Sequence, residues 1–105
     1  MRMIAADDEP LALDMLCEAI AKAAPGAQIE AFSKPSVLLA FAREHPADVA
    51  FLDIKMRGMT GVELAKRLKE SIPDINIVFV TGYDEYAGEA MALHASGYIM
   101  KPVTQ

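Results

Sequence analysis

Acidic side chains stand directly after two short apolar stretches of this chain. Asp7 and Asp8 follow residues 3–6, and Asp53 follows residues 49–52. The carboxyl ends of neighbouring parallel strands meet at one edge of an open α/β sheet, and ligands bind at that edge. Three carboxylates gathered there repel one another unless a cation neutralises them. The sequence therefore predicts a metal site.

The donor atoms of this acidic group indicate which metal it would take. They are all oxygens, and no His or Cys stands nearby in the sequence. Oxygen ligands in small number suit a hard divalent ion that keeps several of its waters. Mg²⁺ is the ion that this pattern favours, with Mn²⁺ as an alternative.

Two further polar residues follow the later apolar stretches. Thr81 comes after residues 75–80, and Lys101 comes after residues 98–100. Neither side chain is a good Mg²⁺ ligand, but both suit phosphoryl oxygens. If an oxygen of Asp53 attacks phosphorus, the metal, the ammonium and the hydroxyl share the charge of the equatorial oxygens. The chemistry indicated is phosphoryl transfer onto an aspartate, which gives an acyl phosphate.

The elements that must position these residues follow an alternating pattern. Short apolar runs recur about every 22 to 25 residues, and each is followed by a segment with helical spacing. This alternation is typical of an α/β domain with a parallel sheet. The predicted strands cover residues 3–6, 29–32, 49–52, 75–80 and 98–100. The second alternates like an edge strand, whereas the third and fourth are predicted to be buried on both faces.

Four helices are predicted between these strands. Pro10 stands where a first helical turn tolerates proline, and Thr60 and Glu63 have the spacing of a capping box before the third helix. The fourth is predicted over residues 85–96, ending at Gly97, and is expected to be the least rigid. The predicted inner stripes are Leu13, Leu16, Cys17 and Ile20 in the first helix, Val37, Leu38 and Phe41 in the second (35–44), and Leu64, Ala65, Leu68 and Ile72 in the third.

Length and composition narrow the class of protein. The chain has 105 residues, 53% of them hydrophobic, and a formal net charge of −5. One domain with its own core is expected, and a disordered chain is excluded. A negative chain repels phosphate backbones and anionic lipid surfaces, so direct binding to nucleic acid or a membrane is not expected. The lone cysteine, Cys17, agrees with a reducing cytoplasm.

Four motifs together resemble a known family over the whole chain. They are Asp7-Asp8-Glu9, Asp53-Ile54-Lys55-Met56, Thr81-Gly82 and Lys101-Pro102. In order and spacing they resemble the receiver domains of two-component response regulators, and residues 79–102 look most like the LytR/AlgR group. The resemblance implies a flavodoxin-like, doubly wound sheet of five parallel strands in the order 2-1-3-4-5.

The resemblance also implies a role for each motif residue. Asp53 is expected to be the phosphoacceptor, taking the group from the histidine of a sensor kinase. Asp8 and Asp53 are expected to bind Mg²⁺ directly, with the backbone carbonyl of Lys55 as a third ligand and Asp7 acting through water. The chain is then a signalling domain, not an enzyme, and catalyses only its own phosphorylation and dephosphorylation.

Three more residues acquire roles through the same resemblance. Lys101 is expected to pair with the phosphoryl group. Thr81 is expected to bond a phosphoryl oxygen, and its inward movement lets the ring of Tyr98 swing inward, changing the surface made by the fourth helix, the fifth strand and the fifth helix. Pro102 is a candidate for a cis peptide bond after Lys101.

The chain departs from the family pattern at two places. Arg57 stands where family members often have proline, so a cation could alter the lifetime of the acyl phosphate. The second departure is at the end of the chain, where residues 1–105 are expected to be a receiver truncated after the fifth strand. The fifth helix and the DNA-binding output domain of the LytR/AlgR group are then absent. Right-handed crossovers leave an apolar strip beside the first helix, and either a second copy, forming a homodimer, or a rearranged segment is expected to cover it.

Two other functions fit part of the same pattern. A phosphohydrolase of the haloacid dehalogenase type also forms an aspartyl phosphate. Such enzymes carry a second acid two residues after the nucleophile, where this chain has Lys55. A vestigial receiver that acts only as an interaction module is the other alternative. The full set of Asp8, Asp53, Thr81 and Lys101 argues against it.

Overall fold

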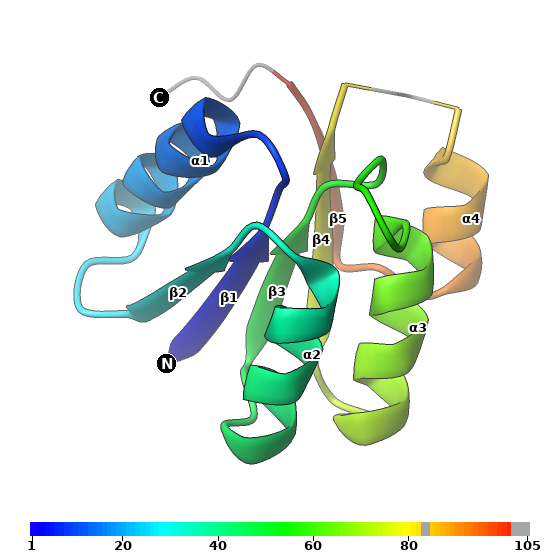
Figure 1. The fold of residues 1–105 in the computed structure, drawn as a ribbon, viewed down its shortest axis with the longest axis horizontal. Helices are drawn as coiled ribbons and strands as arrows, with labels where there is room; N and C mark the ends of the chain where they lie inside the picture. The colour runs from blue at the N-terminus through cyan, green and yellow to red at the C-terminus, as the bar shows by residue number, and fades with distance from the viewer. Residues whose placement is uncertain (83–84, 102–105) are drawn as a thin grey trace.

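Strands and helices alternate along the chain in the computed structural model, which describes residues 1–82 and 85–101 (Figure 1). This order confirms the predicted α/β class, and the observed strands match the predicted ones to within a residue. In sequence order the elements are β1 (Arg2–Ala6), α1 (Pro10–Ala23), β2 (Gln28–Phe32), α2 (Pro35–Glu44), β3 (Val49–Leu52), α3 (Gly61–Ser71), β4 (Asn76–Thr81), α4 (Ala87–Ala92) and β5 (Gly97–Met100).

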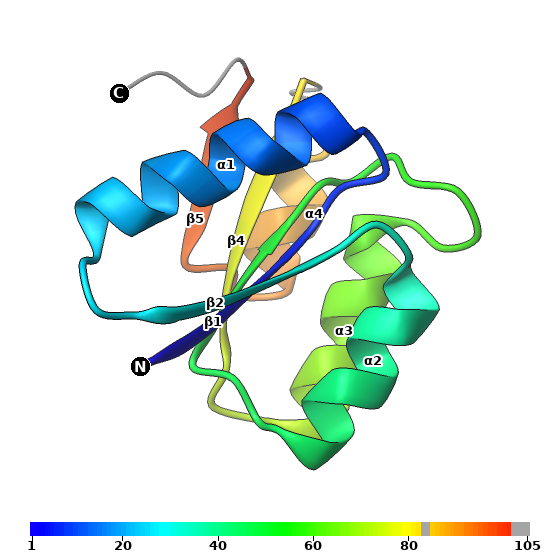
Figure 2. The ribbon, with the colours of Figure 1, turned by 60° about the vertical axis from the view of Figure 1, so that its left-hand side comes forward.

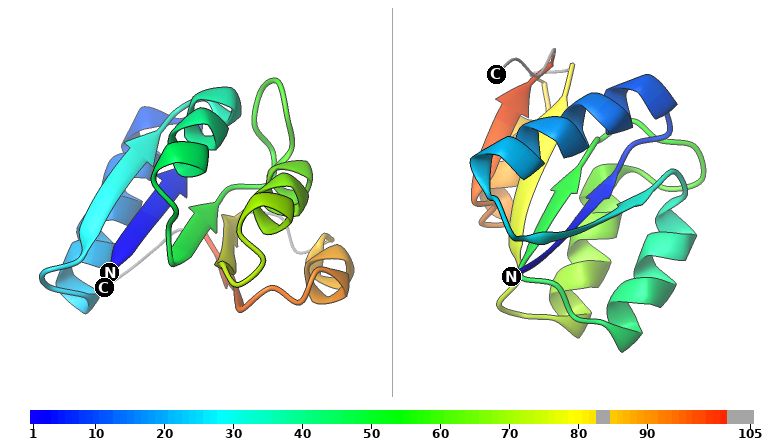
Figure 3. Two further views of the ribbon diagram at one scale, coloured as in Figure 1. Left: turned by 90° about the horizontal axis from the view of Figure 1, so that it is seen from below. Right: turned by 90° about the vertical axis from the view of Figure 1, so that its left-hand side faces the viewer.

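The five strands form one parallel sheet in the order β2-β1-β3-β4-β5. The predicted flavodoxin-like order is thus confirmed. The sheet is twisted, and all its strands point the same way, so their carboxyl ends lie along one edge (Figure 3). β1, β3 and β4 are central strands with neighbours on both sides, and β2 and β5 are the edges.

Helices cover the two faces of the sheet unequally. α1 lies on one face, and α2, α3 and α4 lie on the other (Figures 1 and 2). The larger core lies under the three helices, where Leu38, Leu52, Leu64 and Phe79 are fully buried. The core under α1 is smaller and is centred on residues of α1, β1 and β4.

The α1 face carries apolar side chains that are only partly covered. Phe51 and Val78 are partly buried there, and Ile99, paired in register with the buried Val80 of that face, is 42% exposed. The prediction that the third and fourth strands are buried on both faces is therefore wrong for this face. Among residues 1–82 and 85–101, α1 is the one helix that covers it, which accounts for the exposed strip.

Local signals in the sequence mark the starts of α1, α2 and α3. Pro10 and Pro35 begin α1 and α2, where a missing backbone N–H costs nothing. The Thr60 hydroxyl accepts a hydrogen bond from the Glu63 backbone N–H at 3.2 Å and caps α3. The Glu63 carboxylate accepts a bond from Arg67 one turn later, at 3.3 Å.

Two helical predictions need correction. α4 covers Ala87–Ala92 and ends before His94, whose φ of 57° is left-handed and incompatible with continuing the helix to residue 96. In α2 the buried residues are Pro35, Leu38, Leu39 and Ala42, whereas Val37 is 50% exposed. The inner stripe is therefore rotated by one residue from the predicted one. No helix in the described ranges is long and apolar enough to span a membrane.

Candidate functional site

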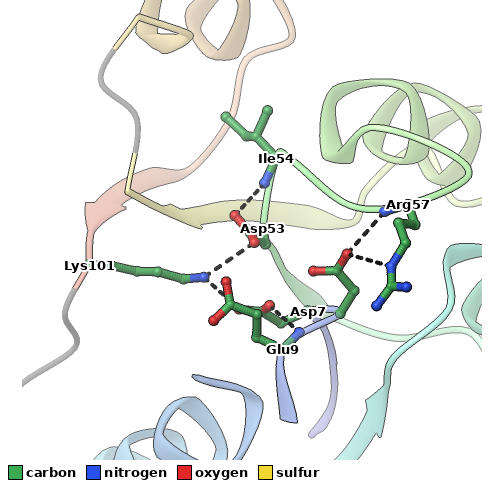
Figure 4. Close-up of polar contacts among 7 residues, drawn as sticks. Asp7, Glu9, Asp53, Ile54, Arg57 and Lys101 are labelled. Atoms are coloured by element: carbon green, nitrogen blue, oxygen red, sulfur yellow. Dashed lines mark hydrogen bonds and ion pairs between the residues drawn. The ribbon is translucent and has the colours of Figure 1, made fainter. Parts of the chain in front are cut away.

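The carboxyl edge of the sheet brings together the acidic residues singled out in the sequence. Asp7 follows β1 and Asp53 follows β3, and these strands are neighbours with Ala6 paired to Leu52. The Asp53 backbone N–H donates to the Ala6 carbonyl at 3.0 Å, which carries the pairing one residue past the strands. Figure 4 shows their side chains pointing toward one another and toward Lys101.

Three carboxylates form a compact cluster at this edge. One oxygen from each of Asp7, Asp8 and Asp53 lies within 4.8 Å of the others. Asp7 is 1% exposed and Asp53 is 5% exposed, so both charges have left bulk water. Burial is the main cause that raises the pKa of Asp53 above 3.8, and the charge of Asp7 adds to it, while Lys101 and the Ile54 N–H oppose the rise. The cluster therefore holds more negative charge than it can neutralise well.

Lys101 supplies the one ammonium seen in contact with these acids in the described part of the chain. Its Nζ donates to Asp7 Oδ2 at 2.7 Å and to Asp53 Oδ2 at 3.2 Å. The Lys101 backbone N–H donates to the Thr81 carbonyl at 2.9 Å, so pairing of β4 with β5 sets its position. Burial alone would lower the pKa of Lys101, but the hydrogen bond to Asp7 and the two nearby charges outweigh it and raise the pKa, so the ammonium stays protonated.

The two buried carboxylates have fixed orientations. Asp7 Oδ1 accepts a hydrogen bond from the Glu9 backbone N–H at 3.0 Å, and Asp53 Oδ1 accepts one from the Ile54 N–H at 2.8 Å. With Lys101 on the Oδ2 atoms, both oxygens of each carboxylate have a donor. Backbone and lysine together hold these two side chains in place before any ligand arrives.

Asp8 lies at the outer rim of the cluster and faces the loop after β3. Its Oδ2 accepts a hydrogen bond from the Arg57 backbone N–H at 3.1 Å, and the Arg57 Nε lies 3.7 Å from the same oxygen. The side chain of Asp8 is 20% exposed, in contrast to the buried pair. The sequence marked Arg57 as unusual, but it gave no sign of this contact.

Thr81 ends β4 at the same edge. The residue is fully buried, and its Oγ1 has no hydrogen-bond partner among the described residues. A buried hydroxyl without a partner is costly, on the order of 1–3 kcal/mol. Such a group is expected where a ligand or a conformational change supplies the missing bond.

Comparison with known proteins identifies the family. The model of the response regulator receiver domain matches residues 3–105. This chain belongs to the response regulator receiver family. Receivers are signalling domains, and the predicted resemblance is thus confirmed.

Similar proteins agree with this assignment. An uncharacterized response regulatory protein of Vibrio cholerae is 39% identical over 102 residues, which cover 96% of this receiver and 39% of that protein. The positive alginate biosynthesis regulatory protein of Pseudomonas aeruginosa, a LytR/AlgR regulator, is 34% identical over 104 residues, with coverage of 98% and 42%. The receiver thus spans about two fifths of the length of these relatives.

A solved structure shares the architecture. The response regulator TrrA from Thermotoga maritima, in complex with Mg²⁺ and BeF, superposes with a TM-score of 0.86 at 26% identity, over 98% of this chain and 88% of that one. The likeness therefore extends over the five-stranded sheet and the helices on both of its faces.

The remaining predicted residues lie near the cluster or outside the described ranges. Lys55 is exposed, and its Nζ lies 6.0 Å from the ring centre of Tyr86. Tyr98 is half-buried on β5, with its ring centre 6.3 Å from that of Phe79. The roles expected for the Lys55 carbonyl and the Tyr98 ring stay predictions. Pro102 lies outside the described residues.

Gly61 is a site residue that the sequence reasoning missed. It begins α3, and its N–H donates to the Ile54 carbonyl at 2.7 Å. A Cβ at this position would collide with the backbone carbonyl of Asp53. The absence of a side chain lets α3 approach the segment that carries Asp53. A glycine at a helix start after a capping threonine was the only signal in the sequence.

A cavity of about 520 Å³ opens beside the cluster. Asp8 and Arg57 lie in its wall together with Lys34, the residue just before α2. The loop after β3 and the start of α2 form the remaining wall, with Ser33, Pro35, Ser36, Gly58 and Met59.

Proposed function

We propose that this receiver accepts a phosphoryl group on Asp53 from the phosphohistidine of a sensor kinase, with Mg²⁺ bound beside it. One observation carries the proposal: Asp7, Asp8 and Asp53 cluster within 4.8 Å, and Lys101 lies against two of them. The Thr81 hydroxyl at the same edge, which has no hydrogen-bond partner within residues 1–82 and 85–101, supports it. A structural ion pair balances its charges. This arrangement instead leaves excess negative charge, together with a Thr81 hydroxyl that has no acceptor among the described residues.

The donor set of the cluster fits Mg²⁺. Three carboxylates in close range offer only oxygen atoms, and a hard divalent ion prefers oxygen. We assign Asp8 and Asp53 as direct ligands with the Lys55 backbone carbonyl as the third. We assign Asp7 a role through water; Lys101 holds its carboxylate more closely, at 2.7 Å, than that of Asp53, at 3.2 Å. When bound, Mg²⁺ neutralises the carboxylates and the phosphoryl oxygens, and Mn²⁺ has the same charge and a similar oxygen preference.

The chain's own residues divide the work of the transfer. An oxygen of Asp53 forms the new bond to phosphorus as the phosphorus–nitrogen bond of the phosphohistidine breaks. The histidine nitrogen keeps the bonding pair and takes up a proton. The Ile54 N–H holds the other Asp53 oxygen, so the carboxylate keeps one orientation during attack. The protonated Lys101 leaves its contact with Asp53 Oδ2 and pairs with a phosphoryl oxygen, where it offsets developing charge.

The response to phosphorylation begins at Thr81. Its hydroxyl donates to a phosphoryl oxygen and so gains the partner that the described residues do not supply. The movement leaves space into which the Tyr98 ring turns, changing the exposed surface around α4 and β5. That surface controls an output domain, which we infer to be a DNA-binding domain of the LytR/AlgR kind acting in the cytoplasm. A homodimer through the partly exposed apolar strip beside α1 is part of the same proposal.

Mass spectrometry of the intact chain tests the phosphoacceptor. Incubation with Mg²⁺ and acetyl phosphate is expected to add one phosphoryl group, and Asp53→Asn is expected to abolish the addition. Asp74→Asn is the matched control, because Asp74 is exposed and remote from the cluster in the fold. Addition that persists in Asp53→Asn would overturn the assignment.

The same incubation separates the rival functions. A receiver consumes about one equivalent of acetyl phosphate and then loses the group slowly. Rapid multiple turnover that depends on Asp53 would instead indicate a phosphohydrolase. No adduct with acetyl phosphate or beryllofluoride would indicate an interaction module.

A further inference from the structure

Arg57 meets the proposed metal site through Asp8. We propose that the Arg57 guanidinium is a built-in counter-ion of Asp8 that competes with the divalent cation and weakens its binding. The inference rests on the proposed function, since it assumes that Asp8 is a metal ligand. It concerns the strength with which the site holds its ion, and not the identity of that ion.

Two contacts from one residue converge on the same oxygen. The Arg57 backbone N–H donates to Asp8 Oδ2 at 3.1 Å, and the side-chain Nε lies 3.7 Å from it. Asp7 and Asp53 share the ammonium of Lys101. Asp8 has no contact with Lys101 among the described interactions, so Arg57 is the cation that neutralises it. A divalent ion bound to Asp8 must therefore share that carboxylate with a positive charge.

The Arg57 side chain can give way to an incoming ion. It is 92% exposed, and it lines the cavity of about 520 Å³ together with Asp8. Gly58 follows with a φ of +90°, a conformation that turns the chain sharply at this point. The backbone therefore holds the start of the side chain near Asp8, while the guanidinium remains loosely held in solvent. A positive group held in this way lowers the affinity of the site for the divalent ion without blocking access to it.

The expected size of the effect follows from the exposure of the pair. Exposed ion pairs contribute little, so removal of the guanidinium is expected to tighten Mg²⁺ binding by about three-fold. The effect is electrostatic and acts near the surface, so salt should weaken it. It is expected to shrink at ~0.5 M NaCl, where the screening length is only a few ångströms.

A titration of the 105-residue chain with MgCl₂, followed by amide NMR shifts, tests the proposal. Arg57→Gln is expected to lower the Kd for Mg²⁺ by about three-fold at low salt, and Arg57→Lys is expected to retain most of the wild-type value. Lys34→Gln is the matched control. Lys34 lies in the wall of the same cavity and carries the same charge, but it has no ion pair in the described part of the chain, so the change in Kd should be clearly smaller.

The outcomes separate this inference from the proposed function. Wild-type chain that binds Mg²⁺, with Arg57→Gln unchanged or weaker, overturns the competition and leaves the metal site intact. An equal effect of Lys34→Gln also overturns it, because the cause is then general charge and not the contact with Asp8. Wild-type chain that binds no Mg²⁺ overturns both the inference and the metal site.

Discussion

The central strands of this sheet bury the site residues that they carry, whereas the edge strand β5 leaves its side chains more exposed. β1, β3 and β4 deliver Asp7, Asp53 and Thr81 to the site, and all three are buried. The edge strand β5 delivers Lys101, which is only half-buried, and leaves Ile99 and Met100 more than 40% exposed. Under the proposed function, the groups that bind the phosphoryl group lie on well-packed central strands, and the surface that changes on phosphorylation lies at the edge of the sheet.

The difference has a physical origin in the sheet itself. A central strand is hydrogen-bonded on both sides and is covered by helices, so few of its residues can move alone. β5 has one strand neighbour, β4, and the α1 face near it is partly open. Local stability should therefore fall from β3 toward β5. Three changes of decreasing effect test this gradient.

The largest effect is expected from a truncation in the central core. Phe79 is fully buried in β4, so Phe79→Ala should lower the free energy of unfolding by about 3–5 kcal/mol. Met100→Ala on the edge is the comparison, and it should cost less than about 1 kcal/mol, because Met100 is 45% exposed. Urea denaturation measures both values. Similar costs would remove the contrast between centre and edge.

A smaller effect is expected where α3 approaches β3. Gly61→Ala introduces a Cβ that collides with the Asp53 carbonyl, and since this is backbone, the segment must shift. We expect a loss of about 2 kcal/mol and slower phosphorylation from acetyl phosphate, because Asp53 moves with its backbone. Gly88→Ala in α4 meets no atom within 4 Å and should be neutral or stabilising by up to about 1 kcal/mol. Wild-type phosphorylation in Gly61→Ala would show that the contact does not position Asp53.

The smallest effect concerns the charge on Asp53 and depends on pH. Its pKa is raised in the folded chain, so the folded state binds the proton more tightly than the unfolded state. Ionised Asp53 therefore destabilises the fold above its folded pKa, and this penalty fades as the pH falls toward 3.8. Asp53→Asn should be more stable than wild type at pH 7, with the difference vanishing in acid.

Thermal unfolding between about pH 4 and pH 8 measures this dependence. Asp74→Asn serves as control, because Asp74 is exposed and lies outside the acidic cluster. If the advantage of Asp53→Asn instead grows in acid, the burial of Asp53 does not destabilise its charged form.

Much of the fold could be predicted because its signals are local. Apolar runs, Pro10, Pro35 and the Thr60 cap mark the elements directly. The inner face of α2 could not be fixed this way, since Val37 and Leu39 flank Leu38 on the helix, and only packing on the sheet and α3 selects Leu39. The early end of α4 depends on the left-handed backbone of His94, a residue that carries no such signal.

In the candidate site, too, some features could be predicted from the sequence and others could not. Asp7, Asp53, Thr81 and Lys101 could be placed together because strand ends in a parallel sheet share one edge. The contacts of Arg57 and Gly61 arise from the path of the loop after β3, which no periodic pattern encodes. Residues that end a strand or directly follow one were therefore predicted, and the contacts made through the loop after β3 were not.

Strand order also sets the distance between the proposed phosphorylation site and the edge strand β5. Only β4 separates the strand that carries Asp53 from the outermost strand, β5, so the two are roughly 10 Å apart across the sheet. One residue, Thr81, ends the strand between them. Under the proposed function, a relay over this distance involves only two side chains, the Thr81 hydroxyl and the Tyr98 ring.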